Sequence, residues 1–222
     1  MVTNTGPISA TMAAMELDMA GPGGIFGRLQ LPEVVTKSSG TEVKIAEQEI
    51  KVTNMDAFVA FNHAIMNDES LVLKLENGKT TIKAFLMKAN ITYAKDVHLK
   101  GMNGPKTIIS KTEVSADGKG FTNTLVATNP SPLEIDLGTA KQEIRNGKGE
   151  VIAEQKGKVY LKKGETTYTM SGTTRGVPAD GEVKIVAMGV EEENWNNLTL
   201  TSFSMPVTPP QEFLALCKPA AS

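Results

Sequence analysis

Apolar and polar positions alternate along most of this chain, and alternation with a period of two residues predicts β-strands. In the first half the pattern predicts strands over residues 43–52 and 91–99. A β-hairpin is expected in the interval, with strands over residues 71–75 and 81–88 joined at Asn77-Gly78, a pair typical of a type I′ turn. The second half predicts strands over residues 107–115, 121–128, 133–145, 150–155, 158–162, 166–172, 182–190 and 196–205.

One segment has a helical period instead. Over about residues 54–67, apolar side chains recur at positions that share one face of an α-helix. Thr53 is placed to cap the free amides of the first turn, with Asp56 three residues later, and Asn67-Asp68 follows the last turn. The sequence therefore predicts one amphipathic helix.

Glycine and proline in Gly101-Met-Asn-Gly-Pro105 divide the chain into two units. We expect residues 1–103 to form a β-sheet with one helix. Residues 104–207 have short strands with turn signals about every 8–12 residues, which is typical of an antiparallel β-sandwich. Because prolines recur near the end of the chain, residues 208–222 are expected to form an extended C-terminal tail, in which only Glu212–Cys217 could form a helical turn. The predicted fold class is mainly β.

Charge and composition exclude several classes of function. Lysine and arginine number 23 and aspartate and glutamate 25, so the net charge is −2 and no basic surface for nucleic acid is expected. A single cysteine rules out an internal disulfide and a cysteine-based metal site. Two histidines leave little material for catalysis, so we predict no enzyme, no catalytic residue, no metal ligand and no cofactor.

The segment Asn129-Pro-Ser-Pro-Leu-Glu-Ile-Asp-Leu-Gly138 opens on two prolines, which hold the start of the strand extended. Together with Ile144-Arg-Asn-Gly147 and Gly149-Glu-Val-Ile152, it resembles the late-embryogenesis-abundant (LEA) type 2 domain, also called the water-stress and hypersensitive-response (WHy) domain. The resemblance covers roughly residues 105–205 and implies a link to stress.

A longer set of motifs resembles a fungal family that carries such a domain in membrane-anchored proteins. The motifs are Gly21-Pro-Gly-Gly-Ile-Phe-Gly27, Leu31-Pro-Glu-Val34, Lys100-Gly-Met-Asn-Gly-Pro105, Gly181-Glu-Val-Lys-Ile-Val186 and Glu193-Asn-Trp195. The resemblance implies an immunoglobulin/fibronectin-like β-sandwich, no catalysis, and a place in the vacuolar lumen or on the extracellular side of a membrane. It also implies an N-terminal anchor, and we expect this chain to be a piece of a longer protein that carries one.

The residues most often used in catalysis and ligand binding all have structural interpretations. The glycines of residues 21–27 predict a tight turn, because Pro22 removes one of the amides that a phosphate loop would need. We expect His63 and His98 at the surface and Cys217 as a partly buried apolar residue. The charge runs over residues 156–163 and 191–193 predict solvated edges, with contact between the lysines and an anionic membrane as the alternative.

The apolar residues of the first unit allow a second hypothesis. Most of them are expected in an ordinary core, but helix and hairpin could also enclose a lipid-sized slot. Its candidate lining residues are Phe58, Phe61, Ile65, Phe85 and Met87. Glycosylation sequons occur at Asn90 and Asn197.

We therefore expect a non-enzymatic binding or structural module that contacts a protein partner or a membrane surface. A lipid or hydrophobic-ligand binding and transfer protein is the alternative function.

Overall fold

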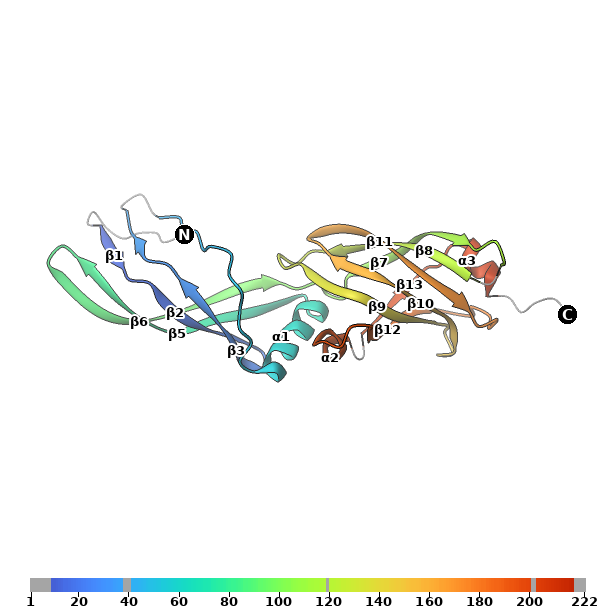
Figure 1. Cartoon of the computed structure of the whole chain (residues 1–222), viewed down its shortest axis with the longest axis horizontal. Helices are drawn as coiled ribbons and strands as arrows, with labels where there is room; N and C mark the ends of the chain where they lie inside the picture. The colour runs from blue at the N-terminus through green and yellow to red at the C-terminus, as the bar shows by residue number, and fades with distance from the viewer. Residues whose placement is uncertain (1–8, 38–40, 119, 201–202, 218–222) are drawn as a thin grey trace. The chain divides into compact units, whose positions relative to one another are not determined.

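The computed structural model of this chain describes residues 9–37, 41–118, 120–200 and 203–217 (Figure 1). The chain is mainly β, as predicted, with two antiparallel sheets and three short helices in these residues. It divides into two compact units. Unit 1 contains Met1–Phe61 and Leu71–Leu99, and unit 2 contains Asn62–Ser70 and Lys100–Ser222, whereas the sequence placed the boundary after residue 103.

Unit 1 is built on one sheet with the strand order β3-β2-β5-β1-β4, and β6 pairs with β5. Buried apolar side chains of β2 and β3 form its core with Met12, Leu75 and Tyr93 packed against them. Its elements are β1 (Ala10–Met12), β2 (Met15–Gly21), β3 (Gly24–Leu31), β4 (Val34–Val35), the first half of α1 (Met55–Asn67), β5 (Ser70–Ala84) and β6 (Met87–Lys100). The second half of α1, from Asn62, belongs to unit 2.

The hairpin turn predicted at Asn77-Gly78 is wrong, because β5 continues through both residues. Asn77 has a positive φ of 61°, and its side-chain amide donates a hydrogen bond to Asp18 Oδ2 at 2.8 Å. A Cβ on Gly78 would lie 2.2 Å from Leu17 Cδ2, so the glycine makes room for the core. The pair therefore bends β5 between the stretch that pairs with β2 and the stretch that pairs with β1. The turn lies at Phe85-Leu86.

The predicted helix is confirmed as α1, but its cap differs from the expectation. Asn54 Oδ1 accepts the Ala57 amide at 3.2 Å, whereas the Thr53 amide donates to the Phe26 carbonyl. The strand predicted over residues 43–52 is wrong. That segment forms no strand ladder, and Gln48 reaches β3 only through its side chain, which bonds the backbone of Gln30.

The glycine-rich segment forms the tight turn that the sequence predicted, between β2 and β3. A Cβ on Gly21 would lie 2.9 Å from the Phe61 ring, and one on Gly23 would lie 2.9 Å from Ala57 Cα. Glycine is therefore needed because α1 packs directly on this turn. Phe26 completes the contact by stacking on Phe61.

Unit 2 is a seven-stranded sheet with the order β13-β12-β9-β10-β11-β8-β7. Its edge strands β7 and β13 contact each other, so the sheet curls around its apolar side chains. The elements are β7 (Lys106–Val114), β8 (Gly120–Asn129), β9 (Ile135–Arg145), β10 (Val151–Leu161), β11 (Gly164–Thr174), β12 (Val183–Val190), α2 (Asn196–Leu200), β13 (Ser204–Val207) and α3 (Gln211–Leu216).

The end of the chain differs from the prediction. The strand expected over residues 196–205 begins instead as α2, and only β13 continues as a strand. In the tail expected to be extended over residues 208–222, the helical turn allowed at Glu212–Cys217 is present as α3, and residues 218–222 lie outside the described residues. Phe213 of α3 is fully buried and packs edge-on against Phe121 at 5.2 Å between ring centroids, which fixes this helix on the sheet.

The Asn-Pro-Ser-Pro motif forms a compact turn before β9. Asn129 Oδ1 accepts the Ser131 amide at 2.9 Å, and Ser131 Oγ accepts the Leu133 amide at 3.0 Å. The Asn129 side-chain amide donates to the Leu133 carbonyl at 2.8 Å. Both polar side chains are buried, so the motif satisfies its own backbone where the prolines leave no strand ladder.

Candidate functional site

β5 and β6 form a long hairpin (Figure 1). Its end carries the most exposed large apolar side chains of the described residues. Phe85 and Leu86 form the turn, and Met87 begins β6. Their exposed fractions are 89%, 89% and 70%. Scattered single apolar residues are normal on a surface, whereas a contiguous group marks a site of interaction. We call Phe85-Leu86-Met87 the hairpin tip.

The backbone of the tip is strained. Phe85 has a φ of 55°, in the left-handed region that favours glycine. For a bulky residue this conformation costs about 1–2 kcal/mol. Strained backbone is concentrated at functional sites. An aromatic ring is thus held in water at a position where glycine would be more stable.

Two lysines lie directly behind the tip. Thr81 Oγ1 donates a hydrogen bond to Asn90 Oδ1 at 2.9 Å, which places these residues opposite each other across the hairpin. Two residues nearer the turn on each strand, the same register places Lys83 opposite Lys88. Both lysines are exposed. The tip therefore combines an apolar end with two positive charges at its base.

Three of the five side chains predicted to line an apolar slot lie on α1. Phe61 is buried and Phe58 half-buried in unit 1, and both rings pack on Phe26 at centroid distances of 4.8 and 5.9 Å. Ile65 is buried in unit 2. The other two, Phe85 and Met87, belong to the hairpin tip and follow the last residue of β5. β5 has 15 residues, which correspond to about 50 Å of extended strand. The structure therefore does not bring the five together in one slot.

The residues predicted to line the slot did not include Leu86, the central residue of the tip. The signal was present as four consecutive apolar residues, Ala84 to Met87, between Lys83 and Lys88. These residues were not recognised as an exposed turn, because the alternating pattern predicted one continuous strand over residues 81–88.

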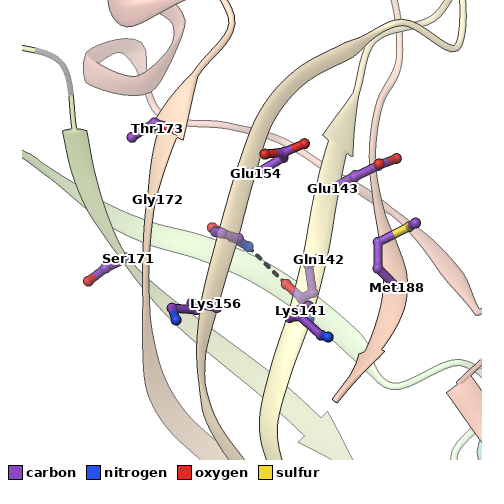
Figure 2. Close-up of a pocket in the computed structure, with 10 residues that line it drawn as sticks. Lys141, Gln142, Glu143, Glu154, Lys156, Ser171, Gly172, Thr173 and Met188 are labelled. Carbon is purple, nitrogen blue, oxygen red and sulfur yellow. Dashed lines mark hydrogen bonds between the residues drawn. The ribbon is translucent and has the colours of Figure 1, made fainter. Parts of the chain in front are cut away.

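A shallow groove of about 480 Å³ lies over the middle strands of unit 2 (Figure 2). Its two glutamates, Glu143 and Glu154, are opposed across β9 and β10, and each is bound by an arginine side chain. Lys156 in the groove binds Glu191 at 2.7 Å. The lining contains hydroxyl groups but no histidine or cysteine. The groove thus offers a mixed polar surface whose carboxylates are already engaged.

The two histidines lie at the surface, as the sequence predicted, and Cys217 is more deeply buried than predicted. His63 on α1 and His98 on β6 are both exposed. Cys217 is 1% exposed, and burial raises the pKa of its thiol to about 11. Because the thiolate is the reactive form, this side chain acts as a small apolar residue.

Over the parts of the chain that the structure describes, no three histidine, cysteine, aspartate or glutamate side chains lie close enough together to hold a metal ion. None of the helices in those parts has the length and apolar content needed to cross a bilayer.

The two sequons differ in accessibility. The exposed Asn90 only accepts the bond from Thr81. Asn197 instead accepts the Val190 amide at 2.7 Å and donates to the Glu192 carbonyl at 3.0 Å.

We predict that secretory expression adds one glycan, at Asn90, because the amide nitrogen of Asn197 is engaged within unit 2. Peptide-N-glycosidase treatment followed by mass spectrometry measures the number of glycans. Thr92→Ala should abolish the mass shift and Thr199→Ala should leave it unchanged. A glycan on Asn197 would contradict this prediction.

Comparisons with known proteins give a family but no activity. No curated protein matches the chain. Among solved structures, it is similar to the exo-chitosanase CsxA of Amycolatopsis orientalis with 12% identity and a TM-score of 0.27. It is similar to the exo-β-D-glucosaminidase CsxA bound to inhibitors with 13% identity and a TM-score of 0.25. Both matches cover 90% of this chain and 24% of the other, and TM-scores this low do not establish a shared fold.

The family model described as "Protein of unknown function (DUF3712)" matches residues 25–144, more than half of the chain. The match begins in β3 and ends in β9, so it includes the hairpin tip. The chain therefore belongs to the DUF3712 family of proteins of unknown function.

Proposed function

We propose that this chain is a non-enzymatic binding module that docks on a membrane surface by inserting its hairpin tip. The observation that carries the proposal is the exposure of three consecutive apolar side chains, Phe85, Leu86 and Met87, at the turn of a long hairpin. Such a projection is shaped to enter a soft apolar phase.

The energy available for insertion is moderate. Moving one Phe, Leu or Met side chain from water into an apolar phase contributes roughly 1.5–3 kcal/mol. Three such side chains contribute roughly 4.5–9 kcal/mol when they are fully buried, which suits reversible binding at a surface. The strain at Phe85 supports the same proposal, because it is retained at the expense of stability.

The proposal includes the setting that the sequence motifs imply. We propose that unit 2 is an immunoglobulin/fibronectin-like sandwich of the LEA type 2 kind, on the lumenal or extracellular side of a membrane. The curled antiparallel sheet and the Asn-Pro-Ser-Pro turn support this fold. The accessible sequon at Asn90 is compatible with that compartment.

Vesicle flotation tests the function. Wild-type protein should float with vesicles of 70% phosphatidylcholine and 30% phosphatidylserine. Leu86→Asp should reduce the partition coefficient more than ten-fold, because it removes an inserted apolar side chain and adds a negative charge. Ile108→Asp is the matched control, since Ile108 is 48% exposed on β7 of unit 2 and lies away from the hairpin sequence.

A second variant separates binding from folding. Phe85→Gly suits the positive φ at this position, so its free energy of unfolding should equal or exceed that of the wild type. It should still lose vesicle binding by about ten-fold, because the ring is gone. Wild-type protein that remains with the soluble fraction, or binding that neither tip variant weakens, would overturn the proposed function.

A further inference from the structure

We infer that the hairpin tip selects bilayers with anionic headgroups, and that Lys83 and Lys88 are the residues that bind them. This inference rests on the proposed function, because the lysines meet headgroups only when the tip is inserted. The ligand is the phosphate or carboxylate anion of lipids in a bilayer.

The register of the hairpin brings the two ammonium groups together. The bond between Thr81 and Asn90 fixes which residues face each other, and Lys83 and Lys88 form the next pair on the same face toward the turn. Like charges opposed in an antiparallel pair destabilise the folded hairpin. An anion bound between the two lysines removes that repulsion, so ligand binding would relieve a cost built into the free protein.

The charge around the tip is uncompensated by acidic residues. Residues 77–95 contain four lysines and no aspartate or glutamate, although the whole chain has a net charge of −2. Within the described residues, no ion pair includes Lys83 or Lys88. By contrast, Lys156 of unit 2 binds Glu191. The hairpin therefore presents free positive charge where unit 2 has neutralised part of its own.

The position of the lysines suits the depth of a headgroup layer. Lys88 directly follows the tip and Lys83 lies two residues before Phe85, and a strand rises about 3.3 Å per residue. When the tip enters the acyl region, the long lysine side chains reach the phosphates above it. One apolar insertion alone gives marginal binding, and a stable membrane contact takes a second signal such as basic residues. The two lysines supply that second signal.

An anionic bilayer fits these observations better than an acidic protein does. A protein partner for the tip would need an apolar pocket ringed by carboxylates, whereas every anionic bilayer presents an apolar interior beneath a layer of negative charge. A second copy of this chain would bring the same lysines together and repel. Anionic lipid is therefore the occupant that matches both the apolar end and the charge behind it.

The test compares two matched double variants on two kinds of vesicle. Lys83→Gln/Lys88→Gln removes the proposed binding pair, and Lys162→Gln/Lys163→Gln removes the same charge from exposed positions of unit 2. Each lysine near an anionic surface contributes about five-fold to binding. On vesicles with 30% phosphatidylserine, the first variant should therefore bind about 25-fold more weakly than wild type, and the second should bind within about two-fold of it.

Vesicles of phosphatidylcholine alone separate the inference from the proposed function. Wild-type protein and Lys83→Gln/Lys88→Gln should bind these neutral vesicles equally weakly, and Leu86→Asp should weaken that binding further. Binding that depends on Leu86 but is equal on neutral and anionic vesicles would overturn the lipid selectivity and leave the proposed function standing. Equal losses of vesicle binding in the two double lysine variants would also overturn the inference. The net charge of the chain, rather than the pair Lys83 and Lys88, would then account for binding to anionic vesicles.

Self-association is the remaining outcome. Light scattering after size exclusion should give one mass at all concentrations for wild type and Leu86→Asp. A concentration-dependent dimer that Leu86→Asp abolishes would assign the tip to a second copy of the chain and overturn both proposals.

Discussion

Gly172→Ala is expected to lower the free energy of unfolding of unit 2 by about 4 kcal/mol or more. Gly172 of β11 pairs with Gln155 of β10 on one side and with Phe121 of β8 on the other. A Cβ at this position would lie 1.9 Å from the Glu154 carbonyl oxygen and 2.8 Å from Gln155 Cα. Both are backbone atoms of the paired strand, so the clash is relieved only by separating β10 from β11.

The loss is large because it approaches the stability of a whole domain, typically about 5–15 kcal/mol. Trp195 is the only tryptophan of the chain and lies in unit 2, so its fluorescence during urea unfolding reports on this unit. Gly149→Ala is the control. Gly149 has a φ of 83° with open space around it, and its replacement should cost only about 1–2 kcal/mol. Equal urea midpoints for the two variants would contradict the close approach at Gly172.

Local periodicity predicted most of unit 2. One face of each strand is buried in the curled sheet, so the alternation read from the sequence coincides with burial, as in β8, where buried and partly buried residues alternate from Phe121. The break predicted between residues 155 and 158 is absent, because Gly157 lies within β10. A Cβ there would meet the Thr169 carbonyl at 2.2 Å. This glycine marks a close approach between strands, which sequence alone does not distinguish from a turn.

The hairpin of unit 1 shows why the candidate site was missed. Asn77-Gly78 has the residue types of a turn, but the bond from Asn77 to Asp18 and the packing of Leu17 over Gly78 make it a bend within β5. Both contacts come from residues distant in sequence, so they are invisible to a local pattern. The turn of the hairpin lies instead at Phe85-Leu86, two residues that are uncommon in turns. The departure from local preference occurs at the residues that we propose to be functional.

The prediction of a strand over residues 43–52 was wrong for a related reason. Alternation predicts a strand only when a partner edge is available. The Gln48 side chain hydrogen-bonds both the backbone amide and the backbone carbonyl of Gln30 on β3. Residues 43–52 therefore form no backbone ladder with another strand. The residues predicted to line an apolar slot lie apart in the chain's fold, because β5 separates Phe85 and Met87 from the side chains of α1.

The second large effect concerns a row of buried polar side chains inside unit 2. The Thr112 hydroxyl donates to Asn123 Oδ1 at 2.6 Å, and the Asn123 amide donates to Gln155 Oε1 at 3.0 Å. The Gln155 amide in turn donates to Gln142 Oε1 at 2.8 Å, a bond drawn in Figure 2. All four residues are at most 7% exposed. The row links β7, β8, β10 and β9 and passes Gly172 of β11, where no side chain blocks it.

Gln155→Leu should lower the free energy of unfolding by about 2–5 kcal/mol, because it leaves the Asn123 amide and the Gln142 oxygen buried without partners. Thr112→Val removes only the end of the row and should cost about 1–2 kcal/mol. The double variant Asn123→Leu/Gln155→Leu should lose less free energy of unfolding than the sum of the two single variants. In each single variant one partner of the Asn123–Gln155 bond stays buried and unpaired, whereas the double variant removes both partners. Additive losses in this cycle, measured by urea unfolding, would contradict a continuous row.

The row also opposes wrong pairing of the strands. A shift of β9 by one residue against β10 would turn Gln142 to the outer face and bring its charged neighbours, Lys141 or Glu143, inside. An apolar residue at position 155 would tolerate such a shift better, because no hydrogen bond would then depend on the register. The loss in Gln155→Leu should therefore be accompanied by faster amide hydrogen exchange in β9 and β10 than in Thr112→Val, which keeps the Gln155–Gln142 bond.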